Sequence, residues 1–148
     1  RPGARTRMQH KRLVIDANIL IRAVFGQRVR ELIANASDHV AFYVAEFNFD
    51  ESCRYSEQLA PKRGIPEDAW RASLDTLMRA IQLIGMDEQQ LVETHARALI
   101  GHRDERDWPG LAAALLMNCP IWTEDQDFFG TGIPTWTTVT VEIYLAAT

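Results

Sequence analysis

Cysteine is scarce in this chain of 148 residues. The two cysteines, Cys53 and Cys119, lie far apart and form neither a CxxC pair nor a ligand spacing with a histidine. Their scarcity excludes a disulfide framework, so we expect two reduced, buried thiols in a cytoplasmic protein. Long apolar runs are missing as well. No stretch approaches the roughly 20 apolar residues that span a bilayer, and we expect no membrane association.

Histidine is equally sparse, and none of the four residues belongs to a metal-ligand motif: His10, His39, His95 and His102. The opening "RPGARTRMQHKR" is basic but lacks the apolar core of a secretory signal. Met8 is a candidate natural start. We therefore expect residues 1–10 to be a basic extension or an expression remnant. Residues 11–148 are then long enough for one domain with a substantial core.

The formal net charge of -4 argues against a general nucleic-acid coat, but the charge is unevenly distributed. Residues 1–30 hold eight basic residues and one acid, whereas residues 104–148 hold seven acids and one basic residue, Arg106. Fourteen of the sixteen basic residues are arginine. Arginine suits bidentate contacts with phosphate, although genomic base composition explains such a bias equally well.

Short apolar strands alternate with amphipathic helices along the chain. Strands are expected at 13–15, 39–46, 80–85 and 120–123, and a strand-like piece with a terminal helical turn at 135–145. Helices are expected at 18–25, 29–37, 47–59 (broken by Pro61 and Gly64), 65–80, 87–101 and 107–118. This alternation predicts an α/β fold with a mostly parallel β-sheet flanked by α-helices on both faces.

Ligand sites in such sheets lie outside the carboxyl ends of the strands. Asp16 ends the first strand, Asp125 follows "WT" at the end of another, Asp107 opens the apolar "LAAALL" helix, and Glu51 lies in the helix after the second strand. Each acid alone has an ordinary explanation: a turn residue, an Asx turn of Asp125 with Asp127, an N-cap, or a solvated helix face.

Taken together, these acids should converge at one edge of the sheet. Two carboxylates about 4 Å apart repel by about 4 kcal/mol at an effective dielectric constant near 20. Several such pairs would consume much of a domain's stability, so oxygen-rich clusters are usually neutralised by a hard cation such as Mg²⁺ or Mn²⁺.

The same residues carry a family resemblance. "LVIDANILI", the acid of "NFDESCRY", and "RDERDWPGLAAALLMNCPIWTEDQDFFGTGIPTWTT" resemble the PIN domain, a Rossmann-like fold, and in particular the bacterial and archaeal PIN proteins of the VapC toxin type. The resemblance extends from Lys11 onward. Its most specific parts are "IDAN" and the pairing of Asp107 with "WTEDQDF", in which Thr123 and Asp125 follow Asp107 by 16 and 18 positions.

The resemblance implies a metal-dependent endoribonuclease that uses one or two Mg²⁺ or Mn²⁺ ions. Its catalytic and metal-binding quartet would be Asp16, Glu51, Asp107 and Asp125, with Asp104 and Asp127 as further candidates. Asn18 would order the loop after the first strand, and Thr123 would help to place substrate or a water molecule. Glu46 remains an alternative to Glu51, because both follow the second strand.

Arginines near the acids would contact RNA phosphates or simply solubilise the surface: Arg22, Arg28, Arg30, Arg103 and Arg106. The four tryptophans are expected in the core, with Trp108 left open because it flanks the site. The implied partners are an RNA substrate, a cognate antitoxin and a second copy in a homodimer. Apolar helix residues that serve either an interface or the core are Leu32, Ile33, Leu74 and Leu77.

Two other functions compete with this interpretation. A catalytically silent PIN-like RNA- or protein-binding module is disfavoured because all four acids are present. A phosphatase on another doubly wound fold is weaker, because "DAN" lacks the second acid of an aspartyl-phosphate DxD site. DNA is an alternative substrate, since the acids themselves do not select the sugar.

Overall fold

The computed structural model describes residues 11–101 and 107–146. Its centre is a five-stranded sheet in the order β3-β2-β1-β4-β5, in which all four strand pairings are parallel. The strands are β1 (Lys11–Ile15), β2 (Val40–Ala45), β3 (Ile81–Ile84), β4 (Ile121–Trp122) and β5 (Thr135–Trp136). The expected α/β fold with a parallel sheet is therefore confirmed. The expected extension at 1–10 lies outside the described residues.

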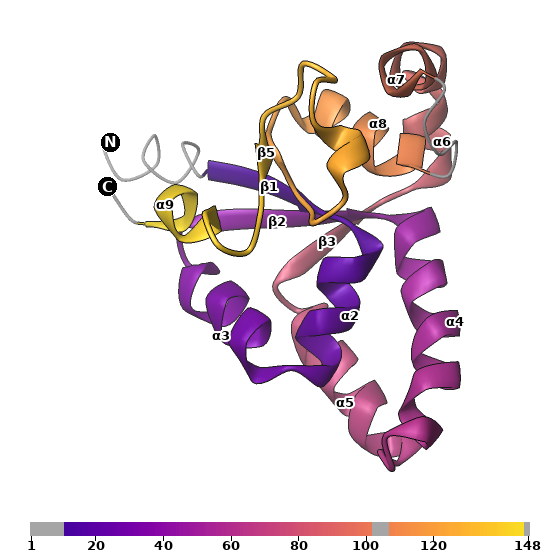
Figure 1. Cartoon of the computed structure of the whole chain (residues 1–148), viewed down its shortest axis with the longest axis vertical. Coiled ribbons are helices and arrows are strands. Elements are labelled where there is room, and N and C mark those ends of the chain that lie inside the picture. Colours follow the sequence, from indigo (N-terminus) through magenta and orange to yellow (C-terminus); the bar gives the residue numbers. More distant parts are fainter. Residues whose placement is uncertain (1–10, 102–106, 147–148) are drawn as a thin grey trace.

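Helices cover both faces of this sheet (Figure 1). They are α2 (Ala17–Phe25), α3 (Gln27–Ala36), α4 (Glu46–Lys62), α5 (Glu67–Leu77), α6 (Met86–Gln90), α7 (Glu93–Ile100), α8 (Trp108–Met117) and α9 (Val141–Leu145). In Figure 1, α2, α3 and α5 lie on one side of the sheet, and α7 and α8 lie on the other. A 3-10 turn, η2 (Gln126–Phe128), follows β4. Among the described residues, none of the helices combines the length and apolar character needed to cross a bilayer.

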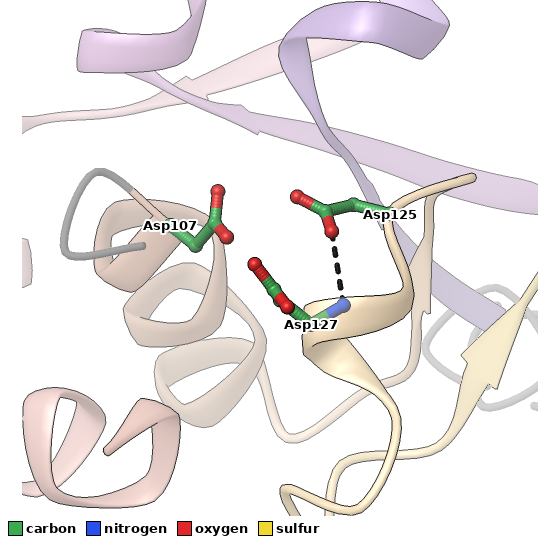
Figure 2. Close-up of side chains that lie close together, drawn as sticks. All are labelled: Asp107, Asp125 and Asp127. Carbon is green, nitrogen blue, oxygen red and sulfur yellow. Dashed lines mark hydrogen bonds between the residues drawn. The ribbon is translucent and has the colours of Figure 1, made fainter. Parts of the chain in front are cut away.

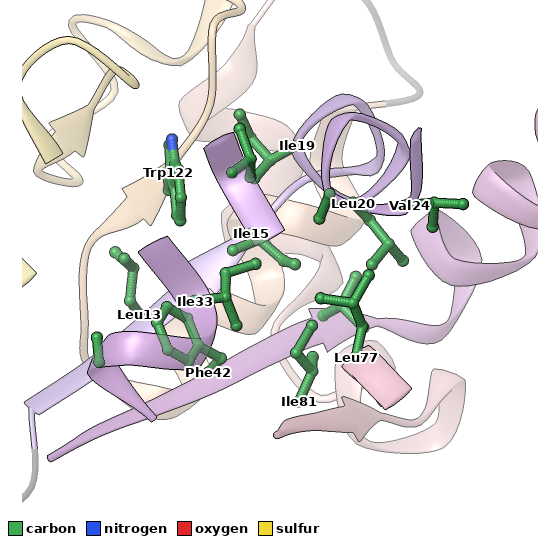
Figure 3. Packing of buried hydrophobic residues seen from close by; sticks show 14 of the residues in the cluster. Leu13, Ile15, Ile19, Leu20, Val24, Ile33, Phe42, Leu77, Ile81 and Trp122 are labelled. Atoms are coloured by element: carbon green, nitrogen blue, oxygen red, sulfur yellow. The ribbon is translucent and has the colours of Figure 1, made fainter. Parts of the chain in front are cut away.

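The strand side chains alternate between two separate cores. Leu13, Ile15 and Phe42 pack with α2, α3 and α5, while Val14 and Tyr43 pack with α7 and α8. Figure 3 shows the first of these clusters, with Trp122 completely buried. Because both faces of the sheet are covered, the open place for a ligand is the edge where the strands end.

The apolar helix residues considered for an interface are mostly in the core. Ile33, Leu74 and Leu77 are buried, and Leu32 packs against the same cluster. Trp70 and Trp108 are also buried, at 2% and 7% exposure. Trp108 therefore presents little ring surface to a base, and the Arg97 guanidinium lies 4.8 Å from its ring centroid. Both cysteines are free thiols, with Cys119 buried as expected and Cys53 half-buried.

Several boundaries differ from the sequence expectations. The single helix expected at 87–101 is two helices, α6 and α7, separated by Leu91 and Val92. Gln89 in α6 is fully buried and donates a hydrogen bond to the Pro109 carbonyl (2.7 Å), whereas Leu91 is 79% exposed. Helix α4 continues through Pro61 to Lys62, although Pro61 has no N–H to donate to the carbonyl of Glu57. The strand expected near the C-terminus is limited to the two residues of β5.

Candidate metal centre

A pocket of about 260 Å³ lies where β1 and β4 end, and all four predicted acids line it. Asp16 directly follows β1, Asp125 follows β4, Asp107 precedes α8, and Glu51 lies in α4. These residues are brought together because parallel strands place their carboxyl ends at the same edge. The four acids come from segments far apart in the chain, so the tertiary fold is what assembles them.

Asp16 is the most buried of these acids, with 7% exposure. Its Oδ1 accepts a hydrogen bond from the Ile19 backbone N–H (2.9 Å) and so caps the start of α2. Burial raises the pKa of Asp16 to about 6, despite the opposing hydrogen bonds from Thr123 and Ile19. The negative charges of Asp125 and Glu124 contribute to the same rise. A cation in the pocket would favour the ionised carboxylate and oppose this shift.

Thr123 is completely buried between two of the acids. Its hydroxyl donates a hydrogen bond to Asp16 Oδ2 and accepts one from the Asp125 backbone N–H (2.9 Å). The sequence prediction gave Thr123 a role in placing substrate or water. Its burial and its two bonds link Asp16 to Asp125, and the role in placing substrate or water stays a prediction.

Asp107, Asp125 and Asp127 form a compact group in which one oxygen of each lies within 4.8 Å of the others (Figure 2). Asp125 Oδ1 accepts a hydrogen bond from the Asp127 backbone N–H (2.9 Å), so the Asx turn considered from the sequence is present. This turn places the carboxylates of Asp125 and Asp127 close to the carboxylate of Asp107. Asp104, the other additional candidate, lies outside the described residues.

The two glutamates that follow β2 have different surroundings. Glu46 Oε1 accepts a hydrogen bond from the Met86 backbone N–H (3.1 Å), at the start of α6. Glu51, one and a half turns further along α4, lines the acidic pocket. This placement makes Glu51 the better candidate for the second acid, and it gives Glu46 a structural partner.

Asn48 is a pocket residue that the sequence analysis did not single out. Its side chain is 6% exposed, and within the described part of the chain Oδ1 has no hydrogen-bond partner. Asn48, Glu51 and Tyr55 all line the pocket and follow one another at i, i+3 and i+7 on one face of α4. That spacing was a signal in the sequence, once Glu51 was placed in a helix.

The remaining predicted residues are distributed differently. Asn18 lines the pocket from the first turn of α2, but the acceptor that caps this helix is Asp16 rather than Asn18. Arg30 donates hydrogen bonds to the Ala23 and Val24 carbonyls (3.0 and 3.2 Å), which makes it a helix-end residue rather than a free phosphate ligand. Arg22 and Arg28 line a neighbouring groove. Arg103 and Arg106 lie outside the described residues.

The donor set of this pocket fits a hard divalent cation. Its polar side chains offer carboxylate and amide oxygens, and the group in Figure 2 already brings three carboxylate oxygens together. The buried Asn48 oxygen, which has no hydrogen-bond partner among the described residues, is a further sign that the pocket takes a cation or an ordered water. Oxygen donors of this kind select Mg²⁺ or Mn²⁺ over thiolate-seeking metals.

Comparison with known proteins defines the class. Residues 14–146 match the PIN domain family, so this chain belongs to the PIN domain family. PIN domains are generally nucleases, and an acidic cluster of the kind described above is present. No curated protein sequence matches the chain.

Solved structures share the fold at low identity. One of them is the structure of VapBC2 from Rickettsia felis bound to a DNA fragment from the VapBC2 promoter. It matches with a TM-score of 0.65 at 10% identity, and the match covers 85% of this chain and 98% of that chain. FitAcB from Neisseria gonorrhoeae has a TM-score of 0.62 at 12% identity and covers 86% and 98%. PAE2754 from Pyrobaculum aerophilum has a TM-score of 0.62 at 15% identity and covers 97% and 94%.

Proposed function

We propose that this PIN domain is an endoribonuclease that requires Mg²⁺ or Mn²⁺. The observation that carries the proposal is the meeting of Asp16, Glu51, Asp107 and Asp125 in one pocket, although they come from four separate segments. Four carboxylates in one pocket are electrostatically costly without a cation. A cation-binding function explains why the fold brings them together.

Each side chain has a distinct part in the proposed site. Asp107 and Asp125, with Asp127 beside them, would hold one cation, because their oxygens already lie within 4.8 Å of one another. Asp16, fixed by Ile19 and Thr123, and Glu51, on the α4 wall, would complete that site or form a second one. When bound, the cation would supply activation of water and neutralisation of charge on the phosphate. The carboxylates would hold it in the pocket.

The proposal extends to a cellular role as the toxin of a toxin–antitoxin pair. Support comes from the sequence motifs that resemble the VapC toxin type. It comes also from the structural similarity to VapBC2, whose name refers to a VapB–VapC pair. The partners would be an RNA substrate, a cognate antitoxin and a second copy of this chain. We place the protein in the cytoplasm, in keeping with its two free thiols. Co-expression with the protein encoded next to it, followed by co-purification, tests the antitoxin part.

The decisive experiment compares wild type, Asp16→Asn and Asp75→Asn on single-stranded RNA, structured RNA and DNA, with Mg²⁺, Mn²⁺ or chelator. Asp75 is an exposed α5 residue that lines neither pocket, so it controls for the loss of one charge. We expect RNA cleavage that needs metal, is lost in Asp16→Asn and persists in Asp75→Asn. A folded wild type that binds metal but cleaves no RNA would favour the catalytically silent binding module. DNA cleavage alone would reassign the substrate.

A further inference from the structure

A second, larger groove of about 500 Å³ adjoins the acidic pocket. The two hollows share Asn18, Ile21 and Tyr55, so they form one continuous depression across α2 and α4. Their charges are opposite. The acidic pocket is lined by four carboxylates, whereas the second groove is lined by the guanidinium groups of Arg22, Arg28 and Arg63.

Three arginines around one groove stand out in a chain of net charge -4. They come from different elements: Arg22 from α2, Arg28 from α3, and Arg63 from the end of α4. The sequence analysis had considered Arg22 and Arg28 but not Arg63, which joins them only through the packing of α4 beside α2. The Arg63 guanidinium lies 5.8 Å from the centroid of the Phe25 ring, and Phe25 also lines the groove.

The acids near these arginines neutralise them only in part. Glu124 is the one carboxylate among the residues lining this groove, and its Oε2 accepts a hydrogen bond from the Thr138 backbone N–H (2.6 Å). Arg28 pairs with Glu142 at 2.5 Å, but both side chains are more than half exposed, at 64% and 55%. Exposed pairs of this kind contribute about 0–1 kcal/mol, so a phosphate can compete for Arg28.

Tyr55 stands on the boundary between the two hollows, and its side chain is 49% exposed. Proteins bind single-stranded nucleic acid with this combination of a half-exposed aromatic ring and a cluster of arginines. The arginines contact the phosphate backbone, and the ring offers a flat surface on which a base stacks. A base stacked on Tyr55 would carry its flanking phosphates toward the acidic pocket on one side and the arginine groove on the other.

We propose that the Arg22–Arg28–Arg63 groove binds the phosphate backbone of single-stranded RNA next to the cleaved bond, with Tyr55 as a stacking surface for an unpaired base. The inference rests on the proposed nuclease function and adds the path of the substrate. Three forked guanidiniums favour a polyanion. Stacking on Tyr55 requires a base that is not paired, so the groove favours single strands over duplexes.

Binding of a short single-stranded RNA in chelator tests this path without cleavage. The variants are Arg22→Gln, Arg28→Gln, Arg63→Gln, Tyr55→Ala and Tyr55→Phe, with Arg79→Gln as a matched control at an exposed position outside both hollows. Each of the three arginine variants should lower the slope of log affinity against log salt by about 0.7, while the control leaves it unchanged. Tyr55→Ala should weaken binding by about 5- to 150-fold, and Tyr55→Phe should retain it.

The outcomes separate this inference from the proposed function. If the groove variants match Arg79→Gln in affinity and salt slope, the inference is overturned. The groove would then be a candidate binding site for a protein segment instead of RNA. Metal-dependent cleavage by the wild type would stand in that case. Conversely, RNA binding that depends on the groove without any cleavage would support the groove and overturn the nuclease proposal. All the substituted side chains are exposed, so each variant should keep the wild-type fold. Circular dichroism and urea unfolding check this.

Discussion

The hydroxyl of Thr123 joins the acids that follow two neighbouring strands: it donates to Asp16 Oδ2 and accepts from the Asp125 backbone N–H at 2.9 Å. Because Thr123 is completely buried, both bonds are protected from water. The geometry of the candidate site therefore depends on a residue whose own side chain is buried.

Thr123→Val keeps the shape of the side chain but removes both hydrogen bonds. A buried carboxylate that loses its donor costs about 1–3 kcal/mol in the free energy of unfolding. Supporting residues of metal sites typically change metal affinity by about 10- to 100-fold, and we expect a loss in that range for Mn²⁺. Urea unfolding and titration calorimetry measure the two effects. Thr123→Ser should preserve both properties, and a Thr123→Val protein with wild-type Mn²⁺ affinity would refute the positioning role.

The raised pKa of Asp16 makes a prediction about stability and pH. Its pKa moves from 3.8 in the unfolded chain to about 6 in the folded one, so the folded state holds this proton more tightly between these values. In metal-free protein, the stability from this group is complete below pH 4 and is lost as the pH rises through 6. The loss is about 3 kcal/mol at about 1.36 kcal/mol for each pKa unit.

Asp16→Asn isolates that contribution, because asparagine caps a helix as well as aspartate does but carries no charge. Relative to wild type, the metal-free variant should become more stable as the pH rises from 4 to 7, and added Mg²⁺ should stabilise only the wild type. Urea unfolding at each pH gives the difference. A constant difference across this range would mean that burial does not control the Asp16 proton.

Glu51→Gln and Glu46→Gln distinguish the two glutamates that follow β2. Glu51 lines the pocket, so Glu51→Gln should weaken Mn²⁺ binding by at least about 10-fold and reduce cleavage. Glu46 instead accepts a bond from the Met86 N–H, a role that the glutamine carbonyl can also fill. Glu46→Gln should therefore cost at most about 1 kcal/mol of stability and leave metal affinity intact. The reverse pattern in calorimetry would assign the site to Glu46.

Asn48→Ala tests whether the buried, unpaired Asn48 oxygen faces a bound cation or its water. Removing the amide should lower Mn²⁺ affinity by about 10-fold. The unfolding of the metal-free protein should change little, because Asn48 Oδ1 has no hydrogen-bond partner within the described residues. Calorimetry and urea unfolding measure these separately. Unchanged affinity together with a large loss of stability would make Asn48 a packing residue.

The local pattern of the sequence was sufficient to predict the fold class and most elements. Leu13–Ile15 and the apolar residues of β2 alternate between two buried faces, which is the signature of a parallel sheet covered on both sides. Asp16 and Asp125 could be placed at the same edge by the same rule. The break between α6 and α7 was not predicted, and neither was the hydrogen bond from Gln89 in α6 to the Pro109 carbonyl twenty residues away, because such a contact depends on tertiary packing.

By itself, the sequence determined which residues end strands and which begin helices, since turn and cap preferences are local. Only the tertiary structure decided which of these residues meet. It placed Glu51 in the pocket and Glu46 against α6, buried Thr123 between two acids, used Arg30 to close α2, and brought Arg63 beside Arg22 and Arg28. The physical reason is that side-chain partners across elements are selected by packing, and packing distances between residues remote in sequence are not contained in local patterns.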